Sequence, residues 1–377
     1  MNQIYDVIVV GCGGVGASVL DFLATQSLSV LGLEQFSLNH AQGSSHGETR
    51  IIRQAYFEHP HYVPLVMEAY ELWRELEAEV SESLLKVTGL LEVGKPTGEL
   101  IRGLRASVAA HDLSIDELSL DEAKQQFPDF RFENEEVAVF EHAAGYLRVD
   151  VCVAAQLAIA QRKGAILRDR CEVRAWKQVG QGVQVETQDA TYHASQVVFC
   201  AGSWTARLLA ELKLPLRVLK KHVHWYHASN ATYSLEEQKP VFYFETDQGH
   251  FYGFPAIDEL GLKVAEHSGG ADVLDPSSVD RSRDEEDTQR IEQFLQSRLP
   301  NASFTPNEHS VCFYTMTPDG HFILDRHPEA KSVLLVGGLS GHGFKFTRVL
   351  GKIVADEIAG GVVDPRIAFF GLNRFRE

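Results

Sequence analysis

Short apolar runs alternate along the chain with longer segments in which apolar residues recur every three or four positions. Residues 6–10 (D-V-I-V-V) form a β-branched run, as expected of a strand buried on both faces of a parallel sheet. Residues 17–24 continue at helical spacing, and a second apolar run covers residues 29–33. The chain is therefore predicted to begin with a strand, a helix and a second, parallel strand.

The turn between the first strand and the helix is rich in glycine. Gly11, Gly13 and Gly16 have the spacing GxGxxG, and Glu34 ends the second strand roughly 20 residues later. Gly11 allows a tight turn, Gly13 lets the backbone approach a pyrophosphate, and Gly16 lets the helix pack closely on the sheet. The helix N-terminus favours phosphates, and Glu34 can accept hydrogen bonds from ribose hydroxyls. These features predict dinucleotide binding and leave FAD and NAD both open.

A polar segment, residues 43–53, runs into two arginines, Arg50 and Arg53. They are three positions apart, and in a helical turn they would share one face. Arginine presents a planar fork of donors to a carboxylate or phosphate. On these residues alone, an anion site and a solvated surface turn both remain open.

The middle of the chain predicts further helices and strands. Residues 62–80 form an amphipathic pattern, residues 118–126 form a helix that Pro128 ends, and Asp150 is expected to cap another helix. Strands are expected at residues 89–93, 137–140, 165–167, 183–186 and 196–200.

Aromatic residues and histidines gather between residue 215 and about residue 300, where apolar and polar positions alternate. This pattern predicts an antiparallel sheet with hairpins. Its aromatic face is compatible both with packing on helices and with the wall of an apolar pocket. A charged stretch at residues 277–286 predicts the capped start of a helix that runs to Leu299.

Two more glycine junctions follow predicted buried strands. Gly202 and Trp204 follow the strand at 196–200, and Gly341, Gly343 and Lys345 follow an apolar run at 333–336. Glycines let backbone N–H groups approach a ligand, and a helix N-terminus favours negative charge there. Both junctions are expected beside the dinucleotide.

Length, charge and cysteine usage narrow the class of protein. A chain of 377 residues is too long for one typical core, so two lobes are expected. The net charge of −17 argues against nucleic-acid binding. The apolar stretch between Asp6 and Asp21 is too short to span a bilayer, and no basic segment precedes it. Five cysteines without a CxxC pair fit a reducing cytoplasm.

Four segments together resemble the monomeric sarcosine oxidase and N-methyltryptophan oxidase family, within the wider glycine-oxidase-like and D-amino-acid-oxidase-like flavoproteins. They are the N-terminal GxGxxG, G-S-S-H-G-E-T-R-I-I-R-Q-A-Y at 43–56, V-C-F-Y-T-M-T-P-D-G-H-F-I-L-D at 311–325, and G-L-S-G-H-G-F-K-F at 338–346. They occur in order and span essentially the whole chain.

The resemblance implies an α/β fold with two domains. We expect a discontinuous, Rossmann-like FAD-binding domain from residues 1–80, 145–215 and 305–377. Residues 81–144 and 216–304 are expected to form a substrate-binding domain around an antiparallel sheet.

The resemblance also implies roles for single residues. Cys312 matches the cysteine that forms a thioether to the 8α carbon of the flavin, and Arg53 and Lys345 match the two cations that hold the substrate carboxylate. Lys263 matches a lysine near flavin N5 that is implicated in oxygen activation. The other matched residues contact the cofactor or the bound amine: His46, Thr49, Arg50 and Val173, then Tyr252 and His267.

The residue types agree with this chemistry. Two cations can hold an amino-acid carboxylate so that a C–H bond points at flavin N5. Hydride transfer needs little acid–base help when the amine is neutral, and a lysine beside the reduced flavin stabilises negative charge on oxygen. We predict a cytoplasmic, monomeric oxidase of a small N-substituted amino acid such as sarcosine or N-methyltryptophan. Its electron acceptor is O2, and its products are an imine that hydrolyses to an aldehyde, the dealkylated amino acid and H2O2.

Some positions depart from the family pattern and leave the substrate open. Ser45 stands where many relatives carry a second histidine, and Glu48 replaces the usual aspartate. Tyr243 is near a pocket position often filled by smaller or more flexible residues, and the histidines between 222 and 227 are unusual. Sarcosine, an N-methyl aromatic amino acid, a cyclic imino acid and a glycated amino acid remain candidates.

Three other functions are alternatives to the oxidase. A flavin dehydrogenase would pass electrons to a partner, and a flavin-binding protein without turnover would act as a sensor. A nicotinamide dehydrogenase leaves the segment around Cys312 unexplained. Beyond the substrate and O2, neither nucleic acid nor membrane is expected as a partner.

Overall fold

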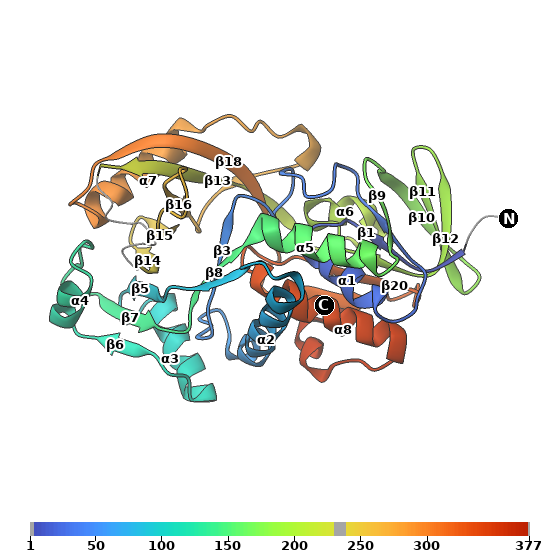
Figure 1. Ribbon diagram of the computed structural model, residues 1–377, viewed down its shortest axis with the longest axis horizontal. Helices are drawn as coiled ribbons and strands as arrows, with labels where there is room; N and C mark the ends of the chain where they lie inside the picture. The colour runs from blue at the N-terminus through green and yellow to red at the C-terminus, as the bar shows by residue number, and fades with distance from the viewer. Residues whose placement is uncertain (1–3, 230–238, 376–377) are drawn as a thin grey trace.

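The computed structural model describes residues 4–229 and 239–375, and within them it contains an eight-stranded, a nine-stranded and a three-stranded sheet (Figure 1). The two large sheets lie toward opposite ends of an elongated molecule. Residues 1–3, 230–238 and 376–377, which the predicted domain ranges include, lie outside the described residues. The domain ranges themselves stay a prediction.

The eight-stranded sheet has a parallel core in the order β9-β2-β1-β12-β20. β10, β11 and β19 join it as antiparallel strands. Its strands are β1 (Ile4–Val10), β2 (Val30–Leu33), β9 (Ile166–Arg168), β10 (Val173–Val179), β11 (Gly182–Thr187), β12 (Thr191–Phe199), β19 (Ile323–Arg326) and β20 (Val333–Gly337).

Helices cover one face of this sheet, where α1 (Gly14–Ala24) packs against α5 (Val149–Arg162) and α8 (Thr347–Gly360), with α2 (Val63–Val80) beside α8. Val7 and Val9 of β1 face the helices, and Ile8 and Val10 face a second core under β10 and β11. Alternate residues of β1 are thus buried on both sides, as the uninterrupted apolar run predicts.

The nine-stranded sheet is antiparallel except where β5 pairs in parallel with β14. Its strands are β5 (Leu90–Gly94), β6 (Asp116–Leu118), β7 (Val137–Glu141), β13 (Arg217–Ala228), β14 (Val241–Thr246), β15 (Gly249–Phe254), β16 (Leu262–Glu266), β17 (Ala271–Asp272) and β18 (Phe304–Met316). Phe242 and Phe244 pack on Phe294 of α7 (Glu285–Arg298). The other face of the sheet is directed toward the pocket described below, since Tyr243 and Tyr252 line it.

The remaining elements connect the two large sheets. α3 (Glu99–His111) and α4 (Leu120–Gln126) accompany β5, β6 and β7. The three-stranded sheet of β3 (Thr49–Ile52), β8 (Gly145–Arg148) and β4 (Leu85–Val87) lies between the two ends of the molecule (Figure 1). No helix in the ranges 4–229 and 239–375 combines the length and apolar character needed to cross a bilayer.

The predicted α/β class is confirmed, and so are the initial strand, helix and strand and the later helices α2 and α4. The helical turn expected for Arg50 and Arg53 is wrong, because Arg50 lies in β3, whose β-branched residues pair with β8. Asp150 does not cap α5. It lies in the first turn, and its carboxylate accepts the backbone N–H of Glu48 at 2.8 Å.

Two further differences concern a strand that was not predicted and the start of a helix. The sequence pattern did not predict β10, an edge strand whose side chains are mostly exposed and therefore do not alternate clearly. The helix expected from the charged stretch at 277–286 begins later, at Glu285. Asp284 caps it by accepting the backbone N–H of Asp287.

Candidate active site

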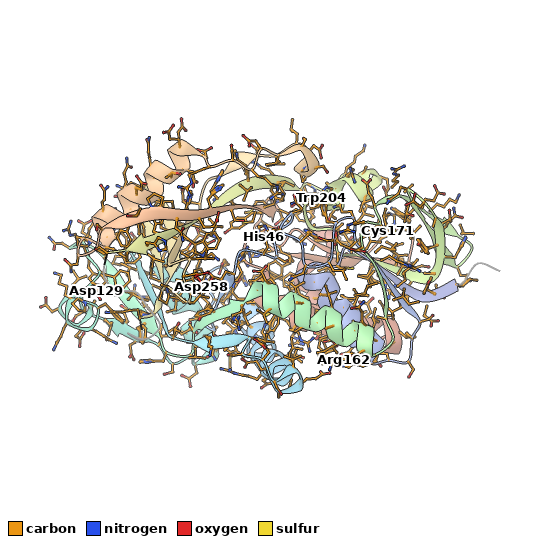
Figure 2. All side chains as sticks on the ribbon, turned by 45° about the horizontal axis from the view of Figure 1, so that its top comes forward. His46, Asp129, Arg162, Cys171, Trp204 and Asp258 are labelled. Atoms are coloured by element: carbon orange, nitrogen blue, oxygen red, sulfur yellow. The ribbon has the colours of Figure 1, made fainter. Side chains whose placement is uncertain are left out.

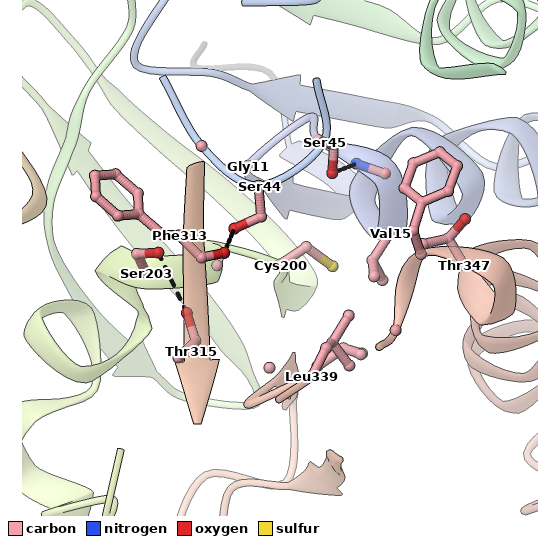
Figure 3. A pocket seen from close by; sticks show the side chains of 18 of the residues that line it. Gly11, Val15, Ser44, Ser45, Cys200, Ser203, Phe313, Thr315, Leu339 and Thr347 are labelled. Atoms are coloured by element: carbon pink, nitrogen blue, oxygen red, sulfur yellow. Dashed lines mark hydrogen bonds between the residues drawn. The ribbon is translucent and has the colours of Figure 1, made fainter. Parts of the chain in front are cut away.

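A pocket with about 1760 Å³ of empty space begins at the carboxyl ends of β1, β12 and β20 and extends to the nine-stranded sheet. Val10, Cys200 and Val336 line it where the three parallel strands end or have just ended. Figure 3 shows the side chain of Cys200 directed into this space, with Leu339 and Thr315 around it. Ligands of open α/β sheets bind at this edge of the strands.

The first glycine junction forms a cradle in this pocket. Gly11 has φ +92°, and a Cβ there would lie 2.5 Å from the carbonyl oxygen of Cys200. A Cβ at Gly13, the N-cap of α1, would meet only Ser45 Oγ, at 3.7 Å, so the backbone lies open to the pocket. Because the first turn of α1 carries no acidic residue, its positive end is available to a phosphate.

Glu34 closes the second half of the cradle. Its carboxylate accepts the backbone N–H of Cys12 at 2.9 Å and of Phe36 at 3.0 Å, and His40 Nε2 lies 3.3 Å away. Burial raises the pKa of Glu34, but these partners outweigh it and keep the pKa below its ordinary value. An ionised carboxylate has about four acceptor positions, so one remains for a ribose hydroxyl.

The other two glycine junctions line the same pocket. Gly202 has φ +50° and leads to Trp204, whose indole N–H donates to Ser277 Oγ at 2.9 Å. Gly341 has φ +80°, and a Cβ there would lie 2.4 Å from the ring of Tyr314. Gly343 and the adenine-contact candidate Val173 also line the pocket. The structure thus brings together all three junctions that the sequence pattern indicated.

Two buried cations lie deeper in the pocket. Arg53 donates from Nη2 to Glu58 Oε2 at 2.6 Å, and Lys345 Nζ donates to the carbonyl oxygen of His342 at 2.9 Å. The negative charge of Glu58 raises the pKa of Arg53 despite its burial. Burial and the charge of Arg53 lower the pKa of Lys345 to about 7.

Aromatic side chains form the wall beside these cations. Tyr243 and His267 meet edge to face with centroids 5.9 Å apart, and His267 Nδ1 lies 3.2 Å from the hydroxyl of Tyr314. Tyr252 lines the pocket next to them. Burial, helped by the charge of Lys221, lowers the pKa of His267 to about 3. The wall is therefore neutral at physiological pH.

Lys263 lies outside the pocket lining and is fully buried. Its Nζ donates to the carbonyl oxygens of Gly47 at 2.5 Å and Thr49 at 2.8 Å, and to Thr49 Oγ1 at 3.0 Å. Burial lowers the pKa of Lys263 well below its ordinary value, the charge of Arg50 lowers it further, and Glu48 opposes both.

The other expected site residues outside the lining lie just behind it. His46 lies near the middle of the molecule (Figure 2) and is bonded to the carbonyl oxygen of Gly43 at 3.1 Å. Burial lowers the pKa of His46 to about 3. Cys312 is 2% exposed and directly precedes Phe313. Phe313 and Arg50 both line the pocket. Gly16 packs on the strand turn, because a Cβ there would lie 1.8 Å from the carbonyl oxygen of Gly11.

Several pocket residues were not predicted from the sequence. Glu58 pairs with Arg53, but no motif marked a glutamate five positions after an arginine. Ser44 and Ser45 lie in the segment 43–56, but no contact to the cofactor or substrate was predicted for either. Ser44 Oγ donates to the carbonyl oxygen of Phe313 at 2.6 Å, and Ser45 Oγ accepts the N–H of Gly14 at 3.1 Å (Figure 3). Spacing alone gives no signal for such contacts between distant segments.

Solved structures share this fold along nearly the whole chain. NikD, an unusual amino acid oxidase essential for nikkomycin biosynthesis, is 24% identical, with a TM-score of 0.85 and coverage of 98% of this chain and 97% of that chain. Glycine oxidase from Geobacillus kaustophilus is 22% identical, with a TM-score of 0.82 and coverage of 99% of each chain. These likenesses establish the fold.

Curated relatives are closer in sequence. Monomeric sarcosine oxidase from Streptomyces avermitilis is 37% identical over 379 residues, covering 99% of this chain and 98% of the relative. N-methyl-L-tryptophan oxidase from Yersinia pestis is 35% identical over 376 residues, covering 99% of this chain and all of the relative. The model of a family described as FAD dependent oxidoreductase matches residues 6–357. With a dinucleotide cradle that suits FAD and relatives matched along the whole chain, this protein belongs to the FAD dependent oxidoreductase family.

Proposed function

We propose that this protein is an oxidase that uses FAD and O2 to oxidise a small N-methyl amino acid. Relatives named sarcosine oxidase and N-methyl-L-tryptophan oxidase support this substrate class. One observation carries the proposal: a single pocket is lined by Arg53 and Lys345, by the aromatic wall and by the glycine junctions. FAD, when bound, accepts a hydride equivalent from the substrate and passes the electrons to O2, which yields H2O2.

Arg53 and Lys345 would hold the substrate carboxylate. Each has donors directed to a buried acceptor, and each also lines the open pocket. A carboxylate bridging the two cations gains charge-assisted hydrogen bonds, worth about 1.5–3 kcal/mol each. Two fixed contacts also orient the rest of a small amino acid, so that one C–H bond faces a single direction.

The aromatic wall would select the neutral form of the amine. Tyr243, Tyr252 and His267 carry no charge there, and burial keeps the pKa of Tyr243 well above its ordinary value. A secondary ammonium group loses its hydration beside these uncharged rings, which favours release of its proton. The same rings limit the size of the substrate and exclude water.

Lys263 would serve the oxygen half of the reaction. The carbonyl oxygens of Gly47 and Thr49 hold its Nζ in one position. A fixed positive charge stabilises the negative charge that develops when O2 accepts an electron. Lys263 also favours the oxidase over a dehydrogenase, since a dehydrogenase has no need for such a charge.

We also propose that Cys312 forms the thioether to the flavin 8α carbon. Its segment matches the family pattern, and Cys312 is buried directly before Phe313, which lines the pocket. The thiol proton and one 8α hydrogen are lost, and O2 takes up the two electrons released. A monomer is supported by the relatives named monomeric sarcosine oxidase. The eight-stranded sheet would organise the FAD domain and the nine-stranded sheet the substrate domain.

The oxidase is tested with purified holoenzyme and a panel of amino acids with and without N-methyl groups, including sarcosine, N-methyltryptophan and proline. We expect stoichiometric O2 uptake and H2O2 release with N-methyl amino acids. Arg53→Lys should lower kcat/KM about 100-fold, since Lys lacks the planar fork. The control Arg105→Lys changes an exposed pair with Glu117 and should have no effect.

Two results would contradict the oxidase proposal in different ways. Reduction of an artificial acceptor without H2O2 would identify a dehydrogenase. A flavin that no amino acid bleaches would indicate a binding protein without turnover.

Acid precipitation tests the thioether. Yellow colour should stay with the pellet of the wild-type protein and pass to the supernatant of Cys312→Ser. Cys171→Ser is the matched control, because Cys171 lines the pocket at the far end, next to Val173. Colour in the wild-type supernatant would reject the covalent link and leave FAD binding intact.

A further inference from the structure

Glu92 is a buried acid without a hydrogen-bond partner. It lies in β5, its residue is 0% exposed, and neither carboxyl oxygen has a partner among the described residues. Nε of Arg53 is also buried and has no hydrogen-bond partner among the described residues. Unpaired buried polar groups reduce stability, and where they persist in a native protein they call for a functional reason.

The two unpaired groups face each other. Glu92 Oε1 lies 3.9 Å from Arg53 Nε, too far for a hydrogen bond but close enough for a small side-chain movement to form one. The guanidinium is meanwhile bonded to Glu58 through Nη2, and its central carbon lies 4.8 Å from the ring centroid of Tyr56 and 4.3 Å from that of Phe57.

The surroundings of Glu92 favour its protonated form. Burial raises the pKa of Glu92 well above its ordinary value; Arg53 and Lys345 oppose this, and the negative charges of Glu141 and Glu58 add to it. At 3.9 Å, Glu92 Oε1 and Arg53 Nε are at the outer limit of an ion pair and make no hydrogen bond. A protonated carboxyl group still has an acceptor oxygen, and it adds no negative charge to compete with an incoming carboxylate.

Glu92 also lies next to the substrate wall. β5 pairs in parallel with β14, and Glu92 is in register with Tyr243, which lines the pocket. On the far side, Glu141 accepts the backbone N–H groups of Gln54 at 2.6 Å and Ala55 at 3.0 Å and so fixes the backbone after Arg53. Movement of Arg53 is thus confined to its side chain, between Glu58 and Glu92.

We propose that Glu92 is a positioning residue for Arg53: when a substrate carboxylate takes the Nη2 donor from Glu58, the acceptor oxygen of Glu92 takes the Nε–H and keeps the guanidinium directed into the pocket. This role rests on the proposed function, because it requires Arg53 to bind a substrate carboxylate. Glu58 then holds the guanidinium in the free protein and Glu92 holds it in the complex.

The test compares Glu92→Gln, which keeps an acceptor oxygen, with Glu92→Leu, which has similar volume and no acceptor. Leu91→Val is the matched control, because Leu91 lies in the same strand but packs in the other core with Phe242 and Phe244. The probe is methoxyacetate, which has an ether oxygen where sarcosine has its nitrogen and is not an amine substrate. Its Kd is measured on each holoenzyme from the change in flavin absorbance, with the melting temperature measured in parallel.

We expect Glu92→Gln to bind methoxyacetate within about threefold of the wild type, and Glu92→Leu to bind it about tenfold more weakly, the loss of one hydrogen bond to a charged group. Glu92→Leu should melt no lower than the wild type, because an unpaired acid has been removed. With an oxidisable substrate, its KM should rise while kcat stays within about threefold. Leu91→Val should melt lower and bind normally.

Three results would overturn the role of Glu92. They are equal Kd values for Glu92→Leu and the wild type, equal weakening in Glu92→Gln and Glu92→Leu, and weakening in Leu91→Val that follows its melting temperature. A wild-type protein that binds methoxyacetate but oxidises no N-methyl amino acid would contradict the proposed function and leave the Glu92 comparison valid. A wild-type protein that does not bind methoxyacetate would overturn the carboxylate site and, with it, the role of Glu92.

Discussion

Nη2 of Arg53 donates a 2.6 Å hydrogen bond to Oε2 of Glu58 within the pocket that is proposed to bind a carboxylate. Burial would raise the pKa of Glu58, but the charge of Arg53 lowers it to about 2, so Glu58 remains ionised at any physiological pH. An incoming carboxylate must therefore compete with an anion that already occupies one donor of its binding partner.

Glu58→Gln should strengthen carboxylate binding. The amide oxygen still accepts from Nη2 but carries no charge, so the ligand competes with a weaker acceptor. We expect the Kd of methoxyacetate to fall severalfold. The free energy of unfolding should decrease by about 2 kcal/mol, because the buried cation loses its counter-ion. Titration and urea unfolding of the same holoenzyme measure both quantities. Weaker binding in Glu58→Gln would indicate that Glu58 orients Arg53 for the ligand.

Carboxylate binding should weaken as pH rises through about 7. The pKa of Lys345 is lowered to about 7, so Lys345 is cationic below this pH and loses its charge above it. The ligand binds the cationic form, and Kd should be constant below pH 6 and rise up to tenfold per pH unit above pH 7. The pKa values of His342, about 4, and His267, about 3, keep both neutral throughout this range.

The measurement is the Kd of methoxyacetate between pH 5.5 and 9. Lys345→Met should bind weakly at every pH and show a flat profile. A wild-type Kd that does not change with pH would mean that Lys345 stays charged, or that it does not contact the carboxylate.

Lys263→Met should separate the two half-reactions. Flavin reduction by substrate under anaerobic conditions should change only a few-fold, because Lys263 does not line the pocket. Reoxidation by O2 should slow by about 100-fold or more, since a fixed charge near developing negative charge is worth that much. Burial lowers the pKa of Lys263, so Lys263 loses its charge at a lower pH than an ordinary lysine. Reoxidation of the wild type should therefore slow as pH rises, at pH values below the ordinary pKa of lysine.

Stopped-flow absorbance measures both half-reactions of Lys263→Met. Lys221→Met is the matched control, because Lys221 is also buried and donates to two backbone carbonyl oxygens, of Ser268 and Gly269. Equal reoxidation rates in Lys263→Met and the wild type would remove Lys263 from the oxygen reaction.

Gly16→Ala should destabilise the cofactor cradle. Its Cβ would lie 1.8 Å from the carbonyl oxygen of Gly11, so α1 must move away from the strand turn. We expect a loss of about 3 kcal/mol in the free energy of unfolding and a reduced FAD content. At Gly360, the last residue of α8, a Cβ meets nothing within 4 Å, so Gly360→Ala should keep its melting temperature and full FAD content. Normal FAD content in Gly16→Ala would contradict the packing role.

Local patterns in the sequence predicted the elements whose conformation is specified by residues close together in the chain. β1, α1 and β2 follow from a buried apolar run, a glycine spacing and helical periodicity. The glycine junctions at Gly202 and Gly341 were predictable for the same reason, since each follows a buried strand directly. The edge strand β10 was not predicted, because an exposed strand has little apolar alternation.

The identity of the site residues came partly from sequence and partly from packing. Arg53 and Lys345 were indicated by matched segments, and both line the pocket. Arg50 was expected on a helical face with Arg53, but pairing with β8 made its segment a strand. That pairing depends on residues almost 100 positions away, which no local pattern includes.

The sequence by itself determined the class of fold and the family, because these depend on residue types in ordered segments, and the family resemblance indicated the two cations of the pocket. Only the tertiary structure decided how Arg53 is held between Glu58 and Glu92. Glu92 reaches Arg53 through the pairing of β5 with β7 and β14. Its complete burial leaves its carboxyl group without a hydrogen bond and raises its pKa. Burial and contact across strands are properties of the packed chain, so the charge state that governs this site arises only on folding.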